Sequence, residues 1–213
     1  MDSFKYIAVE GLIRSGKSEL VQLLSNKFNC KSIYDNRNNP FFDSYLKEVV
    51  SGVDTLSLKT QLIFLLNRYN QQIELDQKGL FQKTAISNYI FERDGIYAHS
   101  VLQNDDDLNI YKKIYSHFLS NTIKPDFVIY LQISFAEMLK RIDCVENEIY
   151  KDVPNEYWRE IFEAYNYFFF NYKTAPLLVV NVEKIDFNNP VNLNSLVDEI
   201  RRHKTGVKYY APG

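Results

Sequence analysis

The chain has little of several residue types, and each shortage excludes a class of protein. Its two cysteines, Cys30 and Cys144, lie far apart and form no metal-ligand spacing, so we expect reduced thiols rather than a disulfide framework or a zinc site. Seven glycines and six prolines leave little material for linkers, and we therefore expect one domain over residues 1–213. Hydrophobic runs stay well below the ~18 residues of a membrane span, and a net charge of −2 provides no basic field for nucleic acid. We expect a cytoplasmic protein with no membrane or nucleic-acid partner.

Residues 11–18 contain the clearest motif of the chain. They read GLIRSGKS, which fits the G-x-x-x-x-G-K-[ST] pattern of phosphate-binding loops. An apolar stretch at 6–9 predicts a buried strand before the loop, and residues 19–24 open an amphipathic helix after it. Strand, loop and helix N-terminus together form a cradle for anions, since backbone N–H groups and the positive helix end face the bound phosphates.

This loop predicts binding of ATP or another nucleoside triphosphate together with Mg²⁺. Lys17 is expected to reach the β- and γ-phosphate oxygens, and the Ser18 hydroxyl is the candidate magnesium ligand. The phosphate-binding residues predicted from the motif are Gly11, Arg14, Ser15, Gly16, Lys17 and Ser18.

Strand and helix patterns alternate along the rest of the chain. Residues 31–34 are a short strand candidate, and apolar strand patterns occupy 84–87, 127–131 and 177–181. Helical patterns occupy 41–50, 58–75, 105–119, 135–142, 156–172 and 193–202. Continuous apolar strands that alternate with helices predict an α/β fold with a parallel sheet covered by helices on both faces. Ligands of such folds bind beyond the carboxyl ends of the strands, where the phosphate loop lies.

Several segments resemble the deoxynucleoside kinase family, especially its bacterial deoxyadenosine and deoxyguanosine kinase branch. They are the loop with its preceding Val9-Glu10, and the segments 39–42, 61–69, 87–91, 124–132, 176–181 and 206–212. The resemblance implies a P-loop kinase fold with a five-stranded parallel sheet and a helical homodimer interface. It also implies transfer of the γ-phosphoryl group of ATP to a deoxynucleoside 5′-hydroxyl, a reaction of nucleotide salvage.

Gln61 and Arg68 are the candidate residues for nucleobase binding. They lie seven residues apart, two helical turns, and therefore share one face of the predicted helix. A carboxamide can pair with a base edge in bidentate fashion, and a guanidinium can fix an acceptor or a carboxylate. The alternative is that both side chains lie on a solvent-exposed face of the helix. The resemblance places Gln61 and Arg68 at the base, and we assign Tyr45 and Asn88 to the same substrate site.

The sequence departs from the family where catalysis takes place. Family members carry a catalytic carboxylate after the second strand, where this chain offers only Asp35, which is either the base or a turn residue. They carry an acidic motif after the third strand, where this chain has Ser87-Asn88-Tyr89. The charged run at 92–94, Glu-Arg-Asp, either supplies the missing charge or belongs to a surface helix.

The predicted lid, about residues 141–155, departs further. Arg141 is retained, whereas Val145 and Asn147 stand where the family has arginines, and several acidic residues surround them. Cations stabilise the transferring phosphoryl group, so this composition predicts slow chemistry that depends on Lys17, Asp35 and Arg141 as catalytic residues, with Arg14 as a replacement cation. Two alternatives to an active deoxynucleoside kinase remain: a catalytically weakened nucleotide-binding homologue that serves as a binding or regulatory subunit, and a kinase for another small acceptor.

Overall fold

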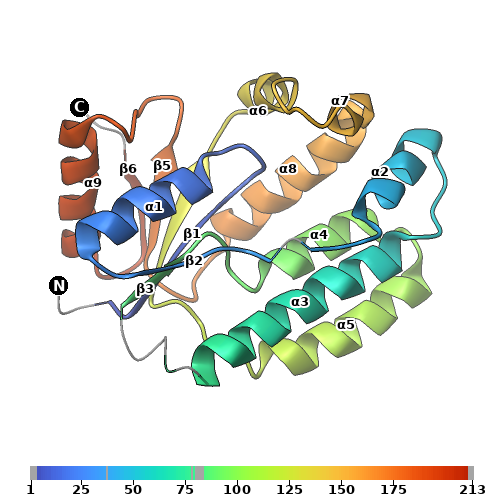
Figure 1. Ribbon diagram of the computed structural model, residues 1–213, viewed down its shortest axis with the longest axis horizontal. Helices are drawn as coiled ribbons and strands as arrows, with labels where there is room; N and C mark the ends of the chain where they lie inside the picture. Colours follow the sequence, from blue (N-terminus) through green and yellow to red (C-terminus); the bar gives the residue numbers. More distant parts are fainter. Residues whose placement is uncertain (1–3, 37, 78, 80–83, 211–213) are drawn as a thin grey trace.

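The computed structural model of the chain describes residues 4–36, 38–77, 79 and 84–210. The ends of the predicted domain, including the last part of the 206–212 segment, lie outside the described residues. Figure 1 shows a central sheet with helices packed around it.

The sheet has six strands, all parallel, in the order β2-β3-β1-β4-β5-β6. The strands are β1 (Tyr6–Gly11), β2 (Lys31–Ile33), β3 (Ala85–Ser87), β4 (Phe127–Gln132), β5 (Leu177–Asn181) and β6 (Val207–Tyr210). The central strands β1 and β4 are buried along almost their whole length because both of their faces are covered.

The prediction of five strands was wrong by one. The additional strand, β6, pairs with β5 at the edge of the sheet, and three of its four residues are exposed. An edge strand that is exposed to solvent needs no continuous apolar run. The continuous apolar run that marks the buried strands is therefore missing from its sequence.

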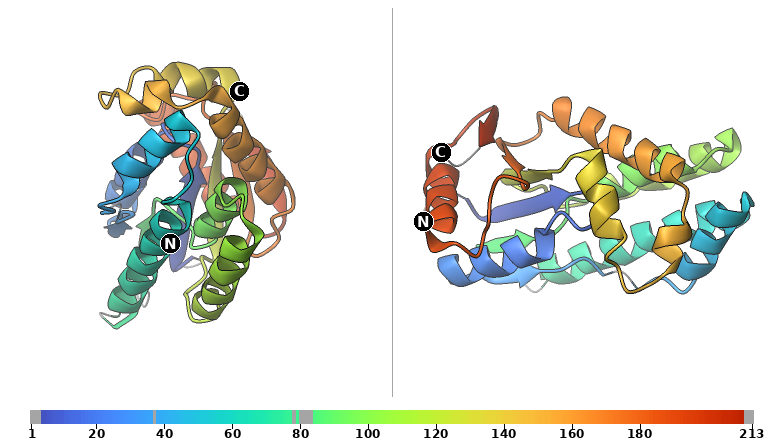
Figure 2. Two further views of the ribbon diagram at one scale, coloured as in Figure 1. Left: turned by 90° about the vertical axis from the view of Figure 1, so that its right-hand side faces the viewer. Right: turned by 90° about the horizontal axis from the view of Figure 1, so that it is seen from above.

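The helices follow the strands in the alternation that the sequence predicts. They are α1 (Lys17–Phe28), α2 (Phe42–Ser51), α3 (Ser57–Gln77), α4 (Arg93–Val101), α5 (Asp105–Leu119), α6 (Phe135–Ile142), α7 (Ile149–Asp152), α8 (Asn155–Phe170) and α9 (Pro190–Arg202). Helix α7 has no counterpart among the predicted helices, and α4 corresponds only to the alternative in which the charged run at 92–94 belongs to a surface helix. Figure 2 shows the sheet between α1 on one side and α8 on the other, with α6 and α7 above the carboxyl ends of the strands.

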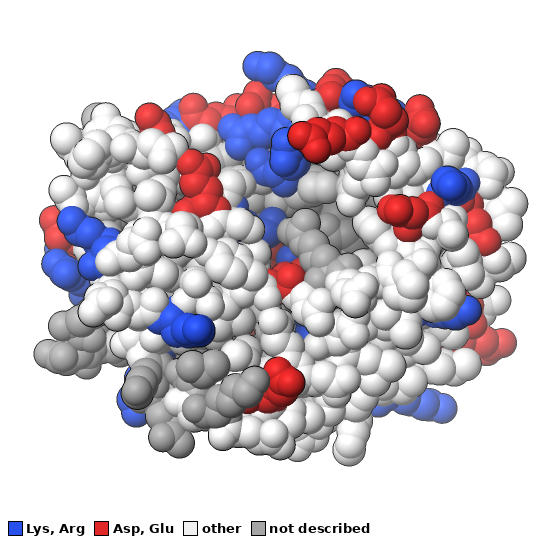
Figure 3. Space-filling model, in the orientation of Figure 1, with Lys and Arg blue, Asp and Glu red and all other residues white. Residues whose placement is uncertain are grey.

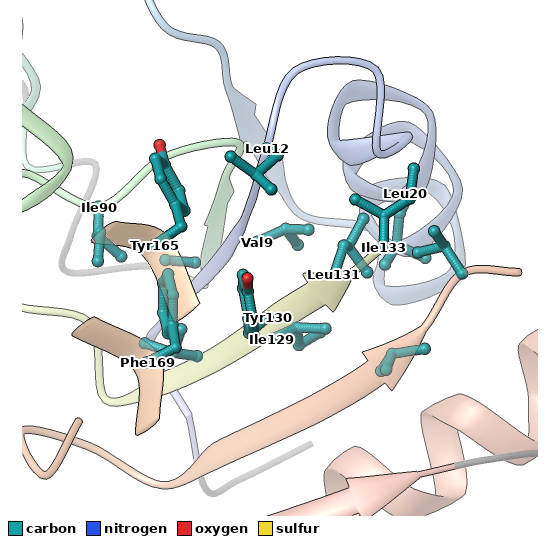
Figure 4. Packing of buried hydrophobic residues seen from close by; sticks show 14 of the residues in the cluster. Val9, Leu12, Leu20, Ile90, Ile129, Tyr130, Leu131, Ile133, Tyr165 and Phe169 are labelled. Atoms are coloured by element: carbon teal, nitrogen blue, oxygen red, sulfur yellow. The ribbon is translucent and has the colours of Figure 1, made fainter. Parts of the chain in front are cut away.

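Aromatic side chains join the sheet to α8 in the core. Figure 4 shows Tyr130 of β4 facing Phe169 of α8, with Tyr165 one helical turn away. The Tyr130 and Phe169 rings stack with centroids 4.0 Å apart. This packing lies near the carboxyl end of β4, where Tyr130 pairs with Glu10 of β1, and the phosphate loop follows β1. Among the described residues, no helix is both long and apolar enough to cross a membrane.

Candidate active site

The phosphate loop follows β1 directly and turns into α1, as the sequence predicts. Gly16 has a φ of +91°, which side chains with a Cβ rarely adopt. At Gly11 a Cβ would lie only 2.7 Å from the Leu131 carbonyl oxygen, so the loop packs against β4 without space for a side chain. The motif therefore requires glycine at these two positions for different reasons: backbone conformation at Gly16 and lack of space at Gly11.

Lys17 is buried and spans the loop from within. Its Nζ donates hydrogen bonds to the Gly11 carbonyl at 2.6 Å and to the Leu12 carbonyl at 2.7 Å. Ser15 is buried in the loop, and the Arg14 side chain is exposed. The ammonium group thus lies at the concave side of the loop, where a bound triphosphate would replace the carbonyl contacts.

Ser18 lies in the first turn of α1 and is exposed, as a magnesium ligand must be. Its Oγ accepts one hydrogen bond, from the Asn88 side chain at 3.0 Å. The described residues contain no cluster of three or more His, Cys, Asp or Glu that could hold a metal on its own. Magnesium would therefore need the phosphate oxygens of its nucleotide beside Ser18, which is how this ion is commonly bound.

A cavity of about 270 Å³ opens beside the phosphate loop. Its walls are mostly aromatic, with charged and amide groups among them. The lining residues are Ile13, Asp35, Phe42, Gln61, Phe64, Arg68, Arg93, Asp94, Tyr97, Tyr150, Tyr157 and Trp158. In the sequence, nothing distinguishes these aromatic residues from those of the core, and only their clustering in three dimensions does so. Flat rings on several sides of a small cavity suit a planar heterocycle.

Gln61 projects from α3 into this cavity. Only 4% of the residue is exposed, and within the described part of the chain its carboxamide has no hydrogen-bond partner. A buried amide without a partner is costly unless a ligand completes its hydrogen bonds. The structure therefore places Gln61 in a binding cavity and not on a solvated helix face.

A buried network of four charges forms one side of the cavity. Arg68 donates to both carboxylate oxygens of Asp35, at 2.7 and 3.0 Å, and a third N–H group of its guanidinium donates to Asp94. Arg93 donates to Asp35 at 3.3 Å. Charges of opposite sign thus pair inside the protein, and the fold brings Asp35 and Arg68 together from segments 33 positions apart.

Burial and pairing change the acidity of these groups in different directions. Burial raises the pKa of Asp94 to about 6, although Arg68 partly opposes this shift. Burial also acts against the charge of Arg68, but Asp94 and Asp35 outweigh it and raise the pKa of the guanidinium further above its usual value. Arg68 stays charged at every physiological pH, whereas Asp94 titrates near the lower end of that range.

Only part of the charged run at 92–94 after β3 belongs to the buried charge network. Arg93 and Asp94 are buried in the network at the start of α4, so they supply the charge that the segment after β3 lacked. Glu92 lines a different groove, between α4, α5 and α8. Burial raises the pKa of the Glu92 carboxyl. The reading of this run as a surface helix was therefore wrong for Arg93 and Asp94.

Two residues assigned to the substrate site lie behind it. Tyr45 is buried outside the cavity lining, and its hydroxyl donates to Tyr157, which does line the cavity, at 3.2 Å. Asn88 is also absent from the lining and lies between Ser18 and Asp35. The structure thus places both as supports of site residues.

The lid covers both parts of the site. Arg141, at the end of α6, donates to Glu137 at 2.8 Å and to the carbonyl of Arg14 in the phosphate loop at 3.2 Å. With Ser15 and Gly16 it lines a hollow of about 160 Å³. At the other end of the lid, Tyr150 of α7 lines the aromatic cavity and stacks on Trp158.

The outer surface of the lid is acidic, as its sequence indicates. Asp143, Glu146 and Glu148 are exposed. Figure 3 shows acidic and basic side chains next to each other along the upper rim, where Figure 1 places α6 and α7, with a hollow below them.

Comparisons with known proteins agree with this geometry. A family model described as deoxynucleoside kinase matches residues 7–204. The deoxyguanosine kinase of Bacillus subtilis is 28% identical over 167 residues, which are 78% of each protein. The deoxyadenosine kinase of Lactobacillus acidophilus is 24% identical, over 87% of this chain and 89% of its own length. A solved structure of deoxyadenosine kinase from M. mycoides with bound dATP has a TM-score of 0.75 at 24% identity, covering 92% of this chain and 99% of that one.

Proposed function

We infer that this chain, which belongs to the deoxynucleoside kinase family, transfers the γ-phosphoryl group of ATP to the 5′-hydroxyl of a deoxynucleoside. One observation carries this inference. A cavity of about 270 Å³ opens beside the phosphate loop; it is walled by aromatic rings and contains the Gln61 amide, which has no hydrogen-bond partner among the described residues. A donor site for phosphates and an acceptor site for a flat polar heterocycle thus lie next to each other.

The charges of the cavity favour an uncharged acceptor. A nucleoside monophosphate brings about two negative charges, which require cations that are available for pairing. Among the described residues, the cations that line the cavity are Arg68 and Arg93, and both already pair with carboxylates of Asp35 and Asp94. We therefore propose that the acceptor is a nucleoside and not its monophosphate.

We assign each residue of the site a separate role in the reaction. Lys17 and Ser18 would hold the triphosphate and its Mg²⁺, which neutralises phosphate charge when bound. As the 5′-hydroxyl oxygen bonds to the γ-phosphorus, the bond from that phosphorus to the β,γ-bridging oxygen breaks and ADP leaves. We assign the hydroxyl proton to the Asp35 carboxylate. Asp35 pairs with Arg68 and Arg93, and a loose transition state requires little basicity of the group that takes the proton.

Arg141 is the cation of the lid that contacts the phosphate loop directly. Because Val145 and Asn147 carry no charge, we propose slower transfer than a lid with additional arginines would give. The exposed Arg14 side chain is a second candidate cation at the same loop.

The family also supports a homodimer and a cytoplasmic enzyme, and we propose both. Sedimentation of the purified chain would test the first proposal, and a sedimenting species of monomer mass at micromolar concentration would contradict it. Fractionation of cells that express the chain would test the second.

Turnover of ATP by the purified protein with each of the four deoxynucleosides tests the reaction itself. We expect formation of a deoxynucleoside monophosphate and ADP in equal amounts, with little turnover of the corresponding monophosphates. Binding of ATP without turnover of any deoxynucleoside would instead support a nucleotide-binding homologue. The Lys17→Ala variant serves as the control for contaminating kinases.

A further inference from the structure

Asn88 links the phosphate loop to Asp35, the carboxylate residue of the proposed acceptor site. It follows β3, is 3% exposed, and its main-chain N–H donates to the Ile33 carbonyl of β2 at 3.0 Å. Its side-chain Nδ2 donates to Ser18 Oγ at 3.0 Å, and its Oδ1 accepts from the main-chain N–H of Asp35 at 2.7 Å. One rigid carboxamide thus contacts a residue of the donor site and a residue of the acceptor site.

Each of these two hydrogen bonds fixes a different functional group. The side-chain Nδ2–H of Asn88 occupies one lone pair of the Ser18 hydroxyl oxygen, which leaves the second lone pair for a metal ion. The bond to the Asp35 N–H holds the main chain where it leaves β2, so the carboxylate stays directed at Arg68. A change at Asn88 would therefore alter both sites together.

A second contact braces the same turn. Glu10 is fully buried at the end of β1, and its carboxylate accepts from the Gly11 N–H at 2.8 Å and from the Ile90 N–H at 3.1 Å. The segment 88–90 is thus fixed to the phosphate loop at two points, so Asn88 has a rigid base from which to orient Ser18 and Asp35.

We propose that Asn88 is a positioning residue for phosphoryl transfer, which sets the Ser18 hydroxyl for Mg²⁺ and the Asp35 carboxylate for the acceptor hydroxyl at a fixed mutual geometry. This inference rests on the proposed function. It predicts that Asn88 variants change the magnesium requirement of the reaction, a readout that a general structural role would not alter.

The test compares Asn88→Ala and Asn88→Asp with a matched surface variant, Asn121→Ala, whose side chain bonds only to its own helix end. The kcat and the Mg²⁺ concentration for half-maximal rate are measured with saturating ATP and deoxynucleoside, and the affinity for Mg²⁺ is measured without turnover, by calorimetry of the ATP complex; an Mg²⁺ affinity that is the same in both Asn88 variants and the wild type would overturn the role at Ser18. We expect Asn88→Ala to raise the half-saturating Mg²⁺ concentration roughly tenfold, the equivalent of one hydrogen bond of about 1.4 kcal/mol, and to lower kcat. Asn121→Ala should match the wild type.

Asn88→Asp separates the two contacts, and it also serves if Asn88→Ala does not fold. Its carboxylate keeps the acceptor for the Asp35 N–H but loses the donor to Ser18. We expect its half-saturating Mg²⁺ concentration to change at least threefold, while the deoxynucleoside KM stays within twofold. In a Ser18→Ala background, Asn88→Ala should add less than a twofold further change in Mg²⁺ requirement.

The outcomes separate this inference from the proposed function. An active wild type whose magnesium requirement is the same in both Asn88 variants overturns the positioning role alone. Fully additive effects of Ser18→Ala and Asn88→Ala overturn it as well. A wild type that phosphorylates no deoxynucleoside overturns the function, and the positioning role with it.

Discussion

Removal of the Gln61 side chain should separate acceptor binding from folding. Gln61 is 4% exposed, lines the cavity and has no hydrogen-bond partner within the described residues. Gln61→Ala therefore removes no hydrogen bond of the folded protein. Its effect should appear when the nucleoside binds, because the base then loses both partners of a bidentate contact.

The expected size of this effect follows from the two hydrogen bonds. At about 0.5–1.5 kcal/mol each, their loss corresponds to a decrease of roughly 5- to 150-fold in kcat/KM for the deoxynucleoside. The KM for ATP should stay within about twofold, because Gln61 does not line the phosphate loop. Steady-state kinetics with one substrate varied at a time measure both constants.

Gln72→Ala is the matched control for this variant. Gln72 lies on the same helix, α3, and is 3% exposed, but it donates to Tyr89 and is not part of the cavity lining. Its removal should lower the melting temperature without changing the deoxynucleoside kcat/KM. The reasoning fails if Gln61→Ala changes this kcat/KM less than twofold, or if it weakens ATP and the deoxynucleoside equally.

Four further outcomes are expected. Lys17→Ala should abolish ATP binding in calorimetry while far-ultraviolet circular dichroism stays unchanged; undiminished affinity would contradict the loop assignment. The kcat/KM for the deoxynucleoside should decline below a pH of about 6, since protonated Asp94 no longer balances Arg68, and an acidic limb that persists in Asp94→Asn would contradict this. Because the pKa of Asp94 is raised on folding, its contribution to the free energy of unfolding falls as pH rises from about 4 to about 6, opposite to activity. Val145→Arg combined with Asn147→Arg should raise kcat at unchanged ATP affinity in stopped-flow and steady-state assays, and an unchanged kcat would argue against the lid as the cause of slow transfer.

The burial of the charged side chains after β3 could not be predicted from the sequence. Arg93 and Asp94 could be surface residues by their sequence, since a charged run is usually solvated. The structure buries them because α4 packs against α3, and this packing brings them to Arg68. Whether a charge is exposed or paired depends on elements distant in the chain, which a local pattern does not contain.

The parts that the sequence determined by itself are those made by neighbouring residues. The phosphate loop is one contiguous segment whose backbone shape depends on its own glycines and on the strand and helix beside it. The buried strands follow from apolar runs that need both faces covered. Tertiary structure alone decided the aromatic cavity, the balanced charges around Arg68 and the place of Asn88 between two sites. Each of these joins side chains from several elements, so each came into existence only when the sheet and its helices packed together.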